Sequence, residues 1–137
     1  MTTLQEPAPR AGARADVVPL VLVVVGVTQV AAGLLAFLAP GAFYDLVAGY
    51  PPENSHFLKD IGSWNLALGG LALYGARRAD WHVPLLGFLA LQYVVHTISH
   101  VIDAGESDPG WHSTFALITQ GFGAVVLVAL VLRERAR

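Results

Sequence analysis

The chain has 137 residues, of which 55% are hydrophobic and 13% charged, and its formal net charge is −2. A soluble domain carries about a quarter charged residues, so lipid is the expected surrounding of most of this chain. It contains no cysteine, which excludes disulfides and thiolate metal sites. No basic patch suited to a nucleic acid occurs, which excludes that class of partner.

Apolar segments of membrane-spanning length organise the sequence. Residues 1–16 are rich in Ala, Pro and Arg, which predicts a disordered cytoplasmic tail. Apolar segments follow at 17–39, 57–76, 83–102 and 113–132, and a basic cytoplasmic tail at 133–137 closes the chain. About 20 apolar residues cross a bilayer as a helix, and each segment reaches this length. The sequence therefore predicts an all-α polytopic membrane protein, built as an antiparallel bundle of four transmembrane helices.

Basic residues predict the orientation of this bundle. Of the 8 basic residues, only Lys59 would lie outside if both termini are cytoplasmic. The others precede the first segment, separate the second from the third, or follow the fourth: Arg10, Arg14, Arg77, Arg78, Arg133, Arg135 and Arg137. The first segment is longer than the apolar core of a signal peptide, so we expect it to be retained. Both termini are predicted to be cytoplasmic.

Two pairs of ionisable residues form the candidate site. His56 and Asp60 are spaced i, i+4, as are His96 and His100, so each pair shares one helix face. In the predicted orientation both pairs lie near the extracytoplasmic face. Ionisable side chains are costly at membrane depth and mark functional sites by default.

Three imidazoles and a carboxylate suit Zn²⁺, with Fe²⁺ or Mn²⁺ as alternatives. The predicted metal ligands are His56, Asp60, His96 and His100, and Asp60 is also the candidate catalytic base on a metal-bound water. Neighbouring polar side chains are expected to orient the ligands: Gln92, Ser99, Asp103 and Asn65. Gln29 and Gln120 each add one carboxamide at buried depth from the first and fourth segments.

Other interpretations of the same residues stay open. The helix dipole and headgroup water can stabilise Asp60 and His100 without any ligand, as in a non-catalytic subunit whose polar cluster is structural. A haem held by His56 and either His96 or His100 is a second alternative, and a proton relay is a third. His112 and Glu106 are expected in a loop, outside the site.

Glycines predict close helix contacts. Gly62, Gly69 and Gly70 lie within the second apolar segment. Small residues let helix backbones approach closely in a bilayer. They are expected to serve packing within the bundle or a homo-oligomer formed through glycine-rich helix faces.

Several short motifs resemble an uncharacterised family of small four-helix bacterial integral membrane proteins. They are Pro40-Gly41-Ala42-Phe43-Tyr44-Asp45, Asn54-Ser55-His56, Lys59-Asp60-Ile61-Gly62, Asn65-Leu66-Ala67-Leu68-Gly69 and His96-Thr97-Ile98-Ser99-His100. The resemblance covers roughly residues 20–130 and follows an HxxxDxG…LALG…HxxxH pattern. It implies that the two ionisable pairs belong together and names no reaction.

These observations predict a metalloprotein of the bacterial cytoplasmic membrane. Its site would open toward the extracytoplasmic face and act, if catalytic, on a membrane-soluble substrate. The alternative of another class is a non-catalytic membrane subunit.

Overall fold

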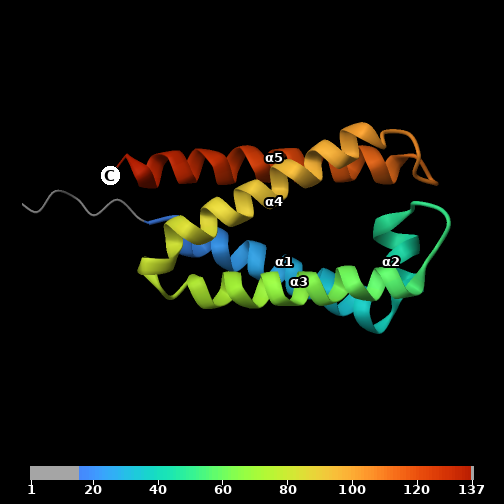
Figure 1. The fold of residues 1–137 in the computed structure, drawn as a ribbon, viewed down its shortest axis with the longest axis horizontal. Coiled ribbons are helices and arrows are strands. Elements are labelled where there is room, and N and C mark those ends of the chain that lie inside the picture. Colours follow the sequence, from blue (N-terminus) through green and yellow to red (C-terminus); the bar gives the residue numbers. More distant parts are fainter. Residues whose placement is uncertain (1–15, 137) are drawn as a thin grey trace, which may run out of the picture.

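A computed structural model describes residues 16–136, and in these residues the secondary structure is helical (Figure 1). Four long helices carry the fold: α1 (Val18–Leu38), α3 (Ser55–Gly75), α4 (His82–Ile102) and α5 (Trp111–Arg135). Three short elements join them: α2 (Pro40–Phe43), the π-helical turn η1 (Tyr44–Ala48) and the 3₁₀ turn η2 (Ala79–Trp81). The prediction of an all-α chain is confirmed.

Each predicted apolar segment overlaps one long helix, and local signals place the helix ends. The Asn54 side chain accepts hydrogen bonds from the backbone N–H groups of His56 and Phe57 at 3.1 and 3.2 Å. This cap places the start of α3 at Ser55, two residues before the predicted start. At the other extreme α5 continues to Arg135, so most of the predicted basic tail is helical. Of the predicted N-terminal tail, only Asp16 belongs to the described residues.

The long helices form two antiparallel pairs. The most extensive contacts join α1 with α3 and α4 with α5, whereas α3 and α4 touch only sparsely. Glycines permit the first pairing. A β-carbon on Gly33 would lie 2.9 Å from the carbonyl oxygen of Gly62, and one on Gly26 would lie 3.1 Å from that of Gly69. The two backbones therefore meet at two glycine pairs, and the two glycines on each helix are seven residues apart.

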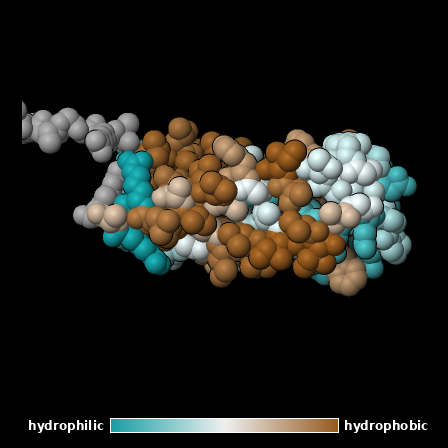
Figure 2. Space-filling model, turned by 90° about the horizontal axis from the view of Figure 1, so that it is seen from above, coloured by the Kyte–Doolittle hydropathy of each residue, from teal (hydrophilic) through white to brown (hydrophobic). Residues whose placement is uncertain are grey.

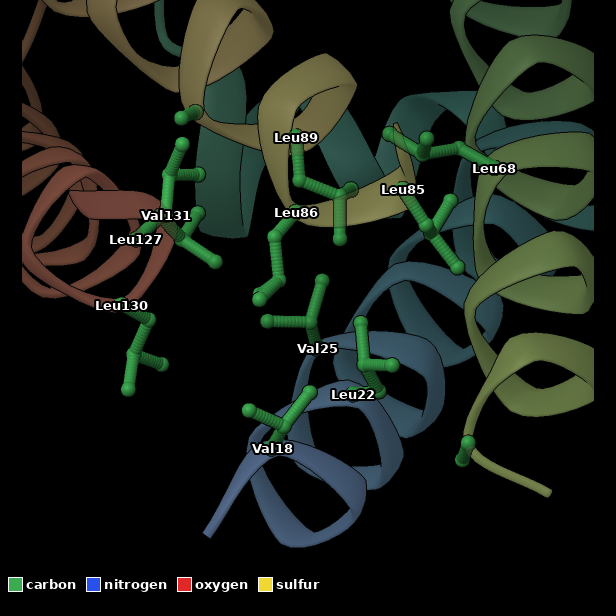
Figure 3. Packing of buried hydrophobic residues seen from close by; sticks show 12 residues of the cluster. Val18, Leu22, Val25, Leu68, Leu85, Leu86, Leu89, Leu127, Leu130 and Val131 are labelled. Atoms are coloured by element: carbon green, nitrogen blue, oxygen red, sulfur yellow. The ribbon is translucent and has the colours of Figure 1, made fainter. Parts of the chain in front are cut away.

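One apolar cluster joins the two pairs at the end of the bundle where α3 ends and α4 begins (Figure 3). We call this the arginine end, because Arg77, Arg78, Arg133 and Arg135 lie there. Leu22, Leu86 and Leu89 are fully buried within the cluster. In lipid such packing is stabilised by van der Waals contact and not by removal of apolar surface from water.

We call the opposite end, where α3 and α5 begin, the histidine end, because His56, His100 and His112 lie there. Here α2 and η1 follow α1 directly, and Ala36, Phe43 and Leu58 pack together in a small second cluster. Gly49 ends η1 in the left-handed region, with φ 65°, and its N–H donates to the Tyr44 carbonyl at 2.9 Å. Glycine reaches this conformation without the steric penalty that a side chain brings.

Large apolar side chains face outward along the helices, including Leu38, Phe122 and Val125, which are 74%, 72% and 69% exposed. Figure 2 shows a hydrophobic, brown region across the middle of the face in view, with hydrophilic residues gathered at both ends. Outward apolar surface of this extent is typical of a protein surrounded by lipid.

Of the four predicted transmembrane helices, three are long and apolar enough to cross a bilayer within residues 16–136. They are α1, the stretch Ala79–Ile102 that includes α4, and α5. The exception is α3, whose first half carries His56, Lys59 and Asp60 on exposed positions. For the orientation, Arg77, Arg78, Arg133 and Arg135 share one end of the bundle, while Arg10, Arg14 and Arg137 lie outside the described residues.

Candidate functional site

A cavity of about 650 Å³ lies between the two helix pairs. Its wall comes from all four long helices, from α2 and η1, and from the loop after η1, so it forms only when both pairs are in place. Its polar lining consists of three imidazoles, four carboxamides and three hydroxyls: His96, His100, His112, Gln29, Asn65, Gln92, Gln120, Tyr50, Ser99 and Thr119. The expected carboxamides of α1 and α5, Gln29 and Gln120, thus lie beside the histidines of α4.

His96 and His100 are stacked on the cavity wall. Their ring centroids are 4.7 Å apart and the rings are inclined by 19°. This follows from the i, i+4 spacing, which puts both side chains on one face of α4. The predicted neighbour Gln92 reaches the first ring, with its Nε2 3.4 Å from His96 Nδ1. An amide nitrogen only donates, so Nδ1 accepts and the ring proton of neutral His96 lies on Nε2.

Tyr50, from the loop after η1, forms a hydrogen bond with the second histidine, His100. Its hydroxyl lies 3.1 Å from His100 Nδ1, and the two ring centroids are 6.1 Å apart. Burial raises the pKa of the Tyr50 phenol above its ordinary value, and the negative charges of Asp103 and Glu106 raise it further. The phenol therefore keeps its proton and can donate it to His100. Tyr50 is not among the residues that the sequence predicts for the site.

His112, the second residue of α5, is 3% exposed and lines the same cavity. The expectation that it lies in a loop is wrong, because it belongs to α5. Neither of its ring nitrogens has a hydrogen-bond partner among the described residues. The backbone of Gly49 closes over it, and a β-carbon on Gly49 would overlap His112 Nδ1. The spacing of residues along α5 could not predict this burial, because the residue that covers His112 lies in a distant part of the chain.

The four predicted metal ligands fall into two separate pairs. His56 Nε2 and Asp60 Oδ2 lie 3.7 Å apart, but their side chains are 84% and 62% exposed and neither residue lines the cavity. Between Asp16 and Ala136, no three His, Asp or Glu side chains are grouped closely enough to hold a metal ion. The predicted zinc centre gains no support from this geometry and stays a prediction.

The predicted supporting residues divide in the same way. Gln92, Ser99 and Asn65 line the cavity. Ser99 donates its hydroxyl to the His96 carbonyl oxygen at 2.8 Å, which satisfies that hydroxyl within its own helix. Asp103 lies just beyond α4, where its charge acts on Tyr50.

Two contacts between the helix pairs lie on the side of the cavity that faces the arginine end. There Gln29 Nε2 of α1 lies 3.5 Å from the Tyr93 hydroxyl of α4, a long hydrogen bond between the two pairs. Trp64 of α3 and Phe88 of α4 meet edge to face, with centroids 6.1 Å apart.

The polar groups of the cavity wall determine what it can do chemically. A neutral imidazole can both accept and donate a proton. The arrangement can therefore bind a largely apolar molecule and exchange a proton with its polar group.

A family model described as a domain of unknown function (DUF4345) matches residues 17–133. The match runs from the residue before α1 nearly to the end of α5, and so includes every element that lines the cavity. Comparison with curated proteins and with solved structures gave no match.

Proposed function

The chain belongs to this domain family, and we propose that it is a multi-pass membrane protein that binds a membrane-soluble molecule between its two helix pairs. The proposed location is the bacterial cytoplasmic membrane, with both termini in the cytoplasm and the histidine end outside. Three apolar helices of spanning length and the arginines gathered at one end support this.

We include α3 as a fourth span in this proposal. It is 21 residues long, as is α1, and it runs antiparallel to α1 along the line of the two glycine pairs. If α1 crosses the bilayer, α3 lies at the same depth. Its charged residues Lys59 and Asp60 lie in its second turn, near the proposed outer interface, where charged side chains can reach the headgroups.

The cavity is the observation that carries the function. Ligand sites are concave spaces of about 300–1,000 Å³ with a mostly apolar lining and a few polar groups. The cavity's volume of about 650 Å³ lies within this range. Its apolar wall includes Leu46, Ile61 and Phe115. A polar wall inside an apolar bundle is expensive in lipid, and binding gives a reason for it.

Filling the cavity tests the proposal. Ala116 lines it, so Ala116→Phe should displace the bound molecule, whereas Ala67→Phe places the same side chain on α3 at a position outside the cavity lining, as a matched control. Solvent extracts of the purified proteins would be compared by mass spectrometry. We expect a molecule that accompanies the unaltered protein and Ala67→Phe but not Ala116→Phe. The same extract from all three proteins would refute the proposal.

Elemental analysis of the same samples tests the metalloprotein alternative. Near-stoichiometric zinc, iron or manganese that disappears in His96→Ala/His100→Ala would establish a metal centre and displace the proposal of a purely organic ligand. An absorption spectrum with a Soret band would identify haem instead.

A further inference from the structure

The charge of the wall limits what the cavity can bind. Among the described residues that line it there is no Asp, Glu, Lys or Arg. A full charge removed from water needs an opposite charge or many hydrogen bonds to offset the loss of hydration. This wall offers no such counter-charge, so a fatty acid, a phospholipid headgroup or an alkyl cation is a poor match. The wall suits a molecule without net charge.

Unsatisfied polar atoms indicate which group that molecule carries. Buried side-chain atoms without a hydrogen-bond partner in the described residues include Gln92 Oε1, Gln120 Oε1 and both ring nitrogens of His112, and all three residues line the cavity. Leaving such an atom unpaired is costly, because its hydrogen bonds to water are lost and not replaced. The three hydroxyls of the wall are already bonded: those of Ser99 and Thr119 donate to carbonyls of their own helices, and that of Tyr50 pairs with His100.

The chemistry of these atoms selects a hydroxyl. An amide oxygen only accepts a hydrogen bond, so the partner of Gln92 or Gln120 must donate. A neutral imidazole such as His112 offers one donor and one acceptor, so its partner must do both. An alcohol or phenol oxygen donates once and accepts twice. An ester or a ketone accepts only, and an alkane does neither.

We infer that the cavity takes an uncharged, lipid-like molecule with a hydroxyl head group, which donates its one proton to the side-chain oxygen of Gln120 while its alkyl or ring body lies against the apolar wall. This inference rests on the proposed function, because it names the class of molecule that the cavity binds.

Three photoreactive probes with one alkyl chain and different head groups test it. A diazirine-bearing long-chain alcohol, the matching carboxylic acid and the matching trimethylammonium would be added to the protein in lipid nanodiscs. After illumination, labelled residues are mapped by mass spectrometry, with unlabelled long-chain alcohol as competitor. We expect saturable labelling of cavity residues by the alcohol and at least tenfold less by either charged probe.

The outcomes separate the two proposals. Equal saturable labelling of the cavity by all three probes would overturn the hydroxyl inference and leave the binding function standing. Labelling confined to outward-facing residues, or labelling that the competitor does not reduce, would mean that no such site exists and would overturn both.

A pair of neighbouring substitutions provides the matched control. Gln120→Leu removes an unsatisfied oxygen, whereas Thr119→Val removes a hydroxyl that already donates to the Phe115 carbonyl at 2.9 Å. Loss of one hydrogen bond weakens binding about tenfold. We expect this loss for Gln120→Leu and little change for Thr119→Val. Equal affinities in the two variants would contradict the inference, and the head-group comparison on the unaltered protein does not depend on either variant folding.

Discussion

The backbone of Gly49 lies against the imidazole of His112, so closely that position 49 has no space for a β-carbon. The same glycine accepts a hydrogen bond from the backbone N–H of Asp108 at 2.7 Å. The loop after η1 is thereby joined to the loop before α5 at the histidine end. Tyr50 and His100, which hydrogen-bond to each other, line the cavity at this end.

Gly49→Ala should destabilise the protein for two reasons. Its φ of 65° strains any residue with a side chain, at about 1–2 kcal/mol, and the new methyl group would overlap His112. We expect a lower melting temperature in detergent, followed by circular dichroism. Gly105→Ala is the control, because Gly105 also has a positive φ, 94°, but open space around it. A decrease in melting temperature no larger than that of Gly105→Ala would show that His112 moves aside freely.

The glycine pairs of α1 and α3 should tolerate no enlargement. A β-carbon on Gly62 would lie 2.8 Å from the backbone nitrogen of Phe37. Gly62→Ala is therefore expected to cost about 1–3 kcal/mol, as overpacking does. Gly70 has nothing within 4 Å of its would-be β-carbon, so Gly70→Ala should be neutral or stabilising by up to about 1 kcal/mol. Chemical unfolding of both variants would measure the difference, and equal effects would contradict the pairing of α1 with α3.

Alkaline pH should weaken the fold through Tyr50. Its pKa is raised in the folded protein, first by burial and then by Asp103 and Glu106. Above about pH 10 the phenol ionises in the unfolded chain before it does so in the folded one, so the Tyr50 contribution to stability is complete below that pH and declines above it. Tyr50→Phe should be less stable by about 1 kcal/mol at neutral pH, because it lacks the hydrogen bond. When the pH is raised further, its free energy of unfolding should decrease less than that of the unaltered protein. Parallel alkaline melting curves for the two proteins would refute this.

Single cysteines should decide the number of spans, because the chain has none of its own. Glu53→Cys and Ala79→Cys flank α3 on exposed positions. If α3 crosses the bilayer, an impermeant thiol reagent applied to intact cells should label position 53 and spare position 79. Glu106→Cys should behave as position 53 does. Labelling of positions 53 and 79 from the same side would restrict the protein to the three apolar spans.

Much of the helical layout follows from the sequence, because the length and composition of an apolar segment depend on neighbouring residues alone. The i, i+4 spacing likewise predicts that His96 and His100 share a face, and their rings do stack. Spacing does not reveal how far each helix is rotated relative to its neighbours. For that reason the spacing could not show that His56 and Asp60 lie apart from the α4 histidines.

The rotation of α3 did leave a signal in its glycines. Gly62 and Gly69 face α1, and Asp60 precedes Gly62 by two residues, which is about 200° around a helix with 3.6 residues per turn. The carboxylate is therefore directed away from α1, and it is in fact exposed. The matching seven-residue spacings, Gly26 to Gly33 and Gly62 to Gly69, are a sequence signal for this contact. Nothing comparable marks the contact between Gly49 and His112, which joins distant loops.

The two ends of the bundle differ in what their side chains do. The apolar cluster that fixes α1, α3, α4 and α5 together lies at the arginine end, whereas the histidines, carboxamides and Tyr50 lie beyond it toward the other end. A substitution on the cavity wall therefore leaves the packing of that cluster intact. If the cavity binds a ligand as proposed, single replacements on its wall can change the preferred molecule while the scaffold that holds the helices together stays the same.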